Sequence, residues 1–154
     1  MQKIKSFLRT EVFFECVLIT FISGFAYLLF VPKFGYFNDD WYLMYAAGAR
    51  GSSVFWDIFA IDRPLRALVM IPAYTLFGSN PLYYNLSAFL FRLMSGFSFL
   101  WILRMIWPGR NRTTLWMALL FLVYPGFLSQ PNAIDYLCHL TGLAAGMLSI
   151  GLTI

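Results

Sequence analysis

Residues 12–31 read VFFECVLITFISGFAYLLFV, and this stretch decides the fold class. About 20 residues, at about 1.5 Å of rise per residue in an α-helix, just cross a hydrocarbon core about 30 Å thick. The composition agrees, because 60% of the residues are hydrophobic and only 12% are charged, against about 45 to 50% and about 25% in soluble domains. The sequence therefore predicts an all-α integral membrane protein.

The charges around this first span predict its orientation. Lys3, Lys5 and Arg9 precede it, and basic residues concentrate on the cytoplasmic side of membrane helices, so we expect a cytoplasmic N-terminus. The absence of a small-residue cleavage site favours a retained anchor over a removed signal peptide. Glu15 lies one turn inside the span, and we expect its carboxylate to reach the interface; a buried partner is the alternative.

Three further apolar segments predict three further spans, at residues 82–103, 114–128 and 137–154. With the first span they give about four transmembrane helices in a single domain, residues 1–154. The third segment is interrupted at Pro125, and the fourth contains Gly142 and Gly146, a spacing that permits close helix packing. Because the sequence is still apolar at Ile154, we expect an N-terminal fragment of a longer protein.

The segment between the first two spans, residues 34–80, predicts a long outer loop that contains interfacial helices. Its apolar part, residues 65–77, has only about 13 residues and includes Pro72, which is too short for a crossing. If it did cross, the basic turn with Arg110 and Arg112 would lie outside, against the usual distribution of basic residues. We therefore expect the whole segment on the outer face.

Three aspartates are the candidate chemical groups of this outer face. Asp39 and Asp40 belong to the run NDDW just after the first span, and Asp135 precedes the fourth. Carboxylates at a membrane face can take a proton from an acceptor or hold a divalent metal ion, provided that the spans bring them together. The structural alternative is that Asn38, Asp39 and Asp40 cap the helix that follows. The acids alone leave both interpretations open.

The basic residues suggest lipid contacts. The net charge of +4 is modest and dispersed, which gives little support to nucleic-acid binding and leaves the lipid bilayer as the expected partner. Arg63 and Arg66 lie in the outer segment, where headgroup or helix-end contacts are one interpretation. Arg92 lies about ten residues into the second span, where a charge needs a partner or a wet cavity. It would contact an outer acid or form a structural pair.

The order of these features resembles the N-terminal part of the GT-C-fold glycosyltransferases. These integral membrane enzymes, which include protein O-mannosyltransferases and aminoarabinose transferases, use polyprenyl-phosphate-linked sugars. The matching pieces are the basic N-terminus with its first span, NDDW at 38–41, RPL at 63–65, YTLFGSNPLYYNL at 74–86 and YPGFLSQ at 124–130 followed by Asp135. The resemblance covers nearly the whole chain through short motifs in a fixed order.

The resemblance implies an inverting sugar transfer to an acceptor at the outer face. Asp39 would be the general base, Asp40 would support it or bind a metal, and Asp135 would orient the substrate or complete a possible divalent metal site. Arg63, Arg66 and Arg92 would bind substrate: Arg63 and Arg66 are the outer candidates for a phosphate clamp, and Arg92 would contact the lipid-linked phosphate. Enzymes of this family have many more spans, so the resemblance also implies that these 154 residues are inactive alone.

The host membrane would be the plasma membrane of a bacterium or the endoplasmic reticulum of a eukaryote. An alternative from another class is a small non-enzymatic multipass protein that packs against a partner through Gly142 and Gly146. A transporter fragment is a third possibility.

Overall fold

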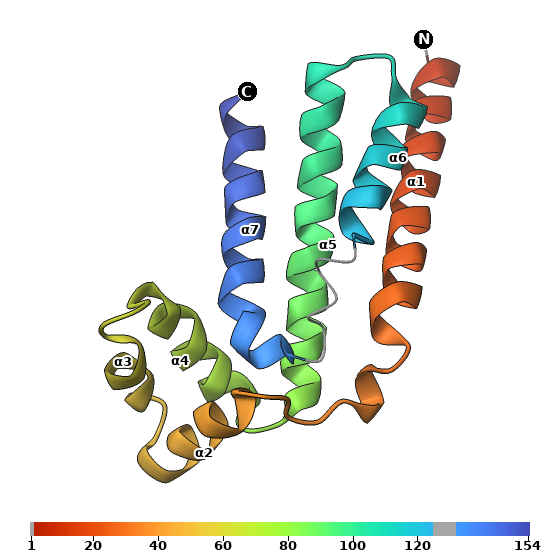
Figure 1. Ribbon diagram of the computed structural model, residues 1–154. Coiled ribbons are helices and arrows are strands. Elements are labelled where there is room, and N and C mark those ends of the chain that lie inside the picture. Colours follow the sequence, from red (N-terminus) through yellow and green to blue (C-terminus); the bar gives the residue numbers. More distant parts are fainter. Residues whose placement is uncertain (1, 125–131) are drawn as a thin grey trace.

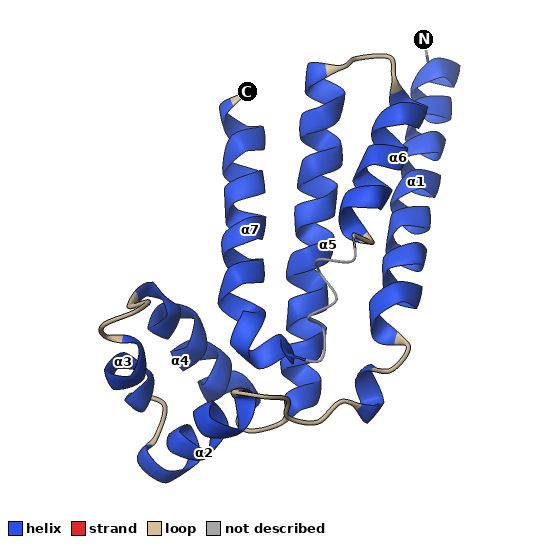
Figure 2. Ribbon diagram, viewed as in Figure 1, coloured by secondary structure: helices blue, strands red, loops and turns tan. Residues whose placement is uncertain are grey.

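The computed structural model describes residues 2–124 and 132–154, and the regular elements in these ranges are all helical (Figures 1 and 2). In chain order they are α1 (Gln2–Leu28), the 3₁₀ helix η1 (Val31–Lys33), α2 (Asp40–Arg50), α3 (Val54–Phe59), α4 (Leu65–Phe77), α5 (Pro81–Ile106), α6 (Asn111–Leu122) and α7 (Ala133–Thr153). The predicted all-α fold class is confirmed.

Three segments among the described residues are long and apolar enough to cross a membrane: Glu11–Lys33, Pro81–Ile106 and Ala133–Thr153. Their helices α1, α5 and α7 run alongside one another, with α5 in contact with both neighbours (Figure 1). Large apolar side chains such as Phe21 and Phe25 of α1 are exposed, as expected for a surface that faces lipid. The prediction of an integral membrane protein is confirmed.

The third predicted span, residues 114–128, differs in the structure. α6 ends at Leu122 after 12 residues, a length of about 18 Å that is shorter than a hydrocarbon core of about 30 Å. The rest of that predicted span includes residues 125–128, which lie outside the described residues. α7 also begins at Ala133, before the predicted start at residue 137, because an acidic residue in a first turn complements the helix dipole. Asp135 is therefore part of the helix.

The segment between the first two spans forms α2, α3 and α4, which gather at the end of the bundle opposite the labelled N and C ends (Figure 1). α4 contacts α3 and α7, and its bounds are those of the short apolar segment predicted at residues 65–77. Buried apolar side chains from α2, α3, α4, α5 and α7 form one cluster here, which we call the loop core; Phe55, Met70 and Leu137 are central members. The loop core holds α4 against α7.

Local sequence explains where these helices stop and start. Gly51 ends α2 with φ of +82° and Gly78 ends α4 with φ of +58°, a backbone region that glycine adopts at little cost. Asn80 caps α5 by accepting a hydrogen bond from the N–H of Leu82 at 3.0 Å, and Pro81 occupies the first turn. Both features favour a sharp start to this helix.

Glu15 has a partner, so the expectation that it simply reaches the interface was wrong. Arg104 of α5 donates a hydrogen bond to its carboxylate, and both side chains are partly buried. An ion pair offsets part of the cost of placing either charge within the bundle. The pair joins α1 to the end of α5 that lies near the N-terminus (Figure 1).

Candidate functional site

A cavity of about 300 Å³ lies where the start of α2, the turn from α3 to α4 and the first turn of α7 meet. We call it the polar cavity. Its lining residues are Asp39, Tyr42, Leu43, Ile58, Phe59, Asp62, Arg63, Arg66 and Asp135. Four predicted site residues, two acids and two arginines, therefore line one cavity at the end of the bundle where α2, α3 and α4 lie.

Arg66 and Asp135 form an ion pair in the wall of this cavity. A guanidinium N–H of Arg66 donates to Oδ1 of Asp135, and the two side chains are only 7% and 17% exposed. The Arg66 guanidinium also lies over the ring of Phe59, 4.4 Å from its centroid, in a cation–π contact. Its Nε atom has no hydrogen-bond partner within the described part of the chain. The arginine is therefore fixed on two sides and keeps one donor available.

Asp40 is turned away from the polar cavity and is almost fully buried. Its Oδ1 accepts a hydrogen bond from the backbone N–H of Asp135 at 3.0 Å, and its Oδ2 accepts one from the N–H of Phe37 at 3.2 Å. Burial raises the pKa of this carboxyl to about 6, although both hydrogen bonds favour the charged form. Asp40 is thus a link between the start of α2 and the N-terminus of α7.

Asp39 is the exposed acid of the pair. It occupies the N-cap position of α2, but its side chain makes no capping hydrogen bond, so the structural alternative considered for it lacks its main contact. Asp39 instead lines the polar cavity. Among the three predicted aspartates, Asp39 is the one that lines this cavity and has no hydrogen-bond or ion-pair partner for its side chain among the described residues.

The three aspartates do not fit a shared metal site. No group of three His, Cys, Asp or Glu side chains in the described ranges is arranged to hold a metal ion. The oxygens of Asp40 accept backbone hydrogen bonds, and Asp135 is paired with Arg66. Carboxylates that are already bound to hydrogen-bond donors would have to give up those partners to become ligands.

Arg63 connects the polar cavity with α7. Its Nε lies 3.0 Å from Oδ2 of Asp62, and its Nη1 lies 3.4 Å from Nε2 of His139. His139 is not among the site residues predicted from the sequence. The signal that could have identified it is its spacing of four residues from Asp135, which places both on one face of a helix.

Arg92 is not part of the polar cavity. It is 1% exposed on α5, and its guanidinium lies over the ring of Tyr27 of α1, 3.9 Å from the centroid. The hydroxyl of Tyr27 donates to the carbonyl of Leu122 at 2.6 Å, so these residues connect α1, α5 and α6. This placement favours the structural alternative for Arg92 over a contact with substrate.

In comparisons with protein-family models, curated proteins and solved structures, no match to this chain was found. The features of this chain that bear on function are the acids and arginines of the polar cavity and the position of this cavity at one end of an apolar helical bundle.

Proposed function

We propose that this chain is part of a membrane glycosyltransferase of the GT-C type that moves a sugar from a polyprenyl-phosphate donor to an acceptor at the outer membrane face. The observation that carries the proposal is that Asp39 shares the polar cavity with Arg63 and Arg66. A base for the acceptor and cationic groups for a departing phosphate are the two functions that such a transfer needs.

In the proposed reaction, the acceptor oxygen or nitrogen forms a bond to the anomeric carbon of the sugar from the face opposite the phosphate. The bond from that carbon to the phosphate oxygen breaks, and the phosphate leaves with the electron pair. Asp39 takes the acceptor proton. Arg63 and Arg66 stabilise the anionic leaving group. A divalent metal ion has no role in this scheme, and Arg92 stays outside it.

The proposed orientation has a cytoplasmic N-terminus and an outer polar cavity. The turn between α5 and α6 carries Arg110, and Arg112 lies in the first turn of α6. This turn lies at the same end of the bundle as the labelled N-terminus, opposite α2 to α4 (Figure 1). Basic residues at one end support a cytoplasmic location of that end.

Replacing Asp39 tests the proposal. In the longest natural chain that contains these residues, Asp39→Asn should lower sugar transfer from a polyprenyl-phosphate donor by about 10² to 10⁴-fold, since a neutral amide cannot accept the proton. Asp57→Asn is the matched control, because Asp57 is an exposed acid of α3 that pairs with Arg50 outside the cavity. Full transfer activity in the Asp39→Asn protein, with normal membrane insertion, would remove the assignment.

A second function, packing against a partner helix, is favoured by the glycines of α7. A Cβ atom added at Gly142 or Gly146 would meet nothing within 4 Å, whereas one added at Gly151 would lie 2.7 Å from Trp101. The predicted small-residue pair therefore makes no close packing contact with the described residues and remains open to another helix. In this alternative, Gly146→Leu abolishes a stable complex, and substitution of Asp39 has no effect.

A further inference from the structure

A second cavity, of about 330 Å³, adjoins the polar cavity between α4 and α7. We call it the α4–α7 cavity. Arg63 and Arg66 line both spaces. Apart from these arginines and His139, its walls include small or apolar side chains such as Val69 and Ala145. The two arginines therefore lie at the boundary between the polar cavity, which contains acids, and the mainly apolar α4–α7 cavity.

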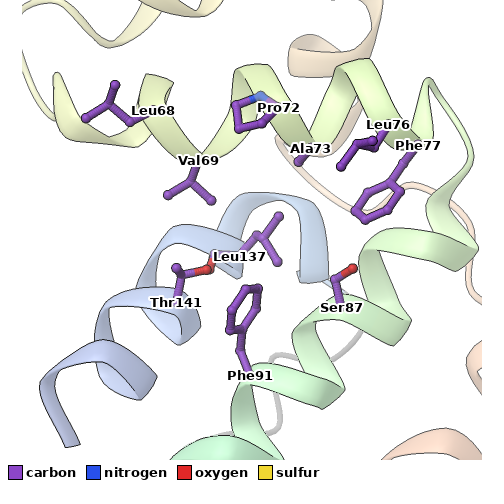
Figure 3. A pocket seen from close by; sticks show the side chains of 10 residues that line it. All are labelled: Leu68, Val69, Pro72, Ala73, Leu76, Phe77, Ser87, Phe91, Leu137 and Thr141. Atoms are coloured by element: carbon purple, nitrogen blue, oxygen red, sulfur yellow. The ribbon is translucent and has the colours of Figure 1, made fainter. Parts of the chain in front are cut away.

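A third cavity, also of about 330 Å³, continues from the second along α4. Figure 3 shows Val69 and Pro72 on α4, Leu137 and Thr141 on α7, and Phe91 reaching in from α5. Val69 and Thr141 line both this cavity and the α4–α7 cavity. Its lining is almost wholly apolar, so an apolar chain fits there and a free sugar or ion does not. The three cavities form a path from charged to apolar surroundings.

The donors at the charged end of this path suit a phosphate. Arg66 is only 7% exposed, and its buried Nε has no hydrogen-bond partner within the described residues. A buried donor that lacks an acceptor costs free energy, which a bound anionic oxygen would recover. Arg63 and His139 lie within 3.4 Å of each other at the same cavity. Guanidinium groups bind phosphate oxygens with high geometric specificity.

We propose that the α4–α7 cavity and the apolar cavity beyond it form one binding site for a phosphate carried on a single long lipid chain, and that the phosphate displaces Asp135 from Arg66. The identity of the lipid rests on the proposed function, whereas its binding is independent of sugar transfer. In the ligand-free protein Asp135 neutralises Arg66. A phosphate has to compete with this carboxylate, so Asp135 weakens binding and thereby lets the product leave.

The two partners of the ion pair are expected to affect binding in opposite directions. Asp135→Asn removes the competitor and should tighten binding of a polyprenyl phosphate about tenfold, or about 1.4 kcal/mol. Arg66→Gln removes the donor and should weaken binding by tenfold or more. The measurement is equilibrium binding of labelled polyprenyl phosphate to the protein in nanodiscs of neutral lipid. Arg50→Gln is the control, because Arg50 is an exposed arginine that pairs with Asp57.

Three further binding measurements test the site: one variant and two other ligands. Ala145→Phe, at an exposed position of α7 that lines the α4–α7 cavity, should block binding without changing the melting temperature. The unphosphorylated polyprenol and inorganic phosphate should each bind at least tenfold more weakly than the lipid phosphate. Equal affinity for inorganic phosphate would overturn the lipid chain's role, and weaker binding by Asp135→Asn would overturn the competition. If lipid binding behaves as expected but Asp39→Asn retains transfer activity, only the proposed function fails.

Discussion

Asp40 joins two segments that lie 95 residues apart through one buried carboxylate. Burial raises its pKa from 3.8 to about 6, so the folded protein holds this proton more tightly than the unfolded chain does. The stability that Asp40 contributes is therefore fully present below about pH 4 and is lost as the pH rises to about 6, a total of about 3 kcal/mol. Above pH 6 the carboxylate is charged in a poorly solvated place.

The expected result is a pH dependence that Asp40→Asn lacks. Between pH 4.5 and pH 7.5, the unfolding free energy of the wild-type protein should fall by about 2 kcal/mol relative to that of the variant. Denaturant unfolding in detergent micelles at the two pH values measures this difference. Parallel pH profiles for the two proteins would show that the Asp40 carboxyl has an ordinary pKa in the folded state.

Sequence reasoning found four residues of the polar cavity, but it placed Asp40 in the same site as Asp39, whereas Asp40 is buried and does not line the cavity. Successive residues at the start of a helix point about 100° apart, so when Asp39 faces the cavity, Asp40 has to face elsewhere. Which of the two is buried depends on how α2 packs on α7. The pairing of Arg66 with Asp135 across 69 residues likewise depends on tertiary packing, about which neither local motif carries information.

At the level of the helices, the crossing of α5 and α6 has a close contact at Gly96. A Cβ atom there would collide with the side chain of Leu122, which is fully buried and cannot move without displacing its neighbours. Gly96→Ala should therefore destabilise the protein by about 1 to 3 kcal/mol. Gly146→Ala is the matched control in a helix with open space around the glycine, and it should stabilise by up to about 1 kcal/mol.

Thermal unfolding of both glycine variants in the same detergent tests this packing. A stabilised Gly96→Ala protein would mean that α6 does not pack on α5 at this point. A similar contrast applies to the helices predicted from the sequence: apolar length located α1, α5 and α7, but it did not predict where α6 ends or where α7 begins. Gly96 and Gly146 look alike in the sequence, since both lie in apolar segments, and only the neighbouring helix distinguishes them.

For the whole molecule, the decisive question is which side of the membrane holds the polar cavity. Single cysteines at Ser79, in the exposed link before α5, and at Asn111, at the start of α6, mark the two ends of the bundle. With Cys16 and Cys138 replaced by serine, a membrane-impermeant thiol reagent added to intact cells should label Ser79→Cys and leave Asn111→Cys unlabelled until the membrane is opened. This follows from the basic residues near α6, which favour the cytoplasmic side. The reverse pattern would place Asp39 and the two arginines in the cytoplasm, where an acceptor at the outer face could not reach them, and the proposed sugar transfer would then be untenable.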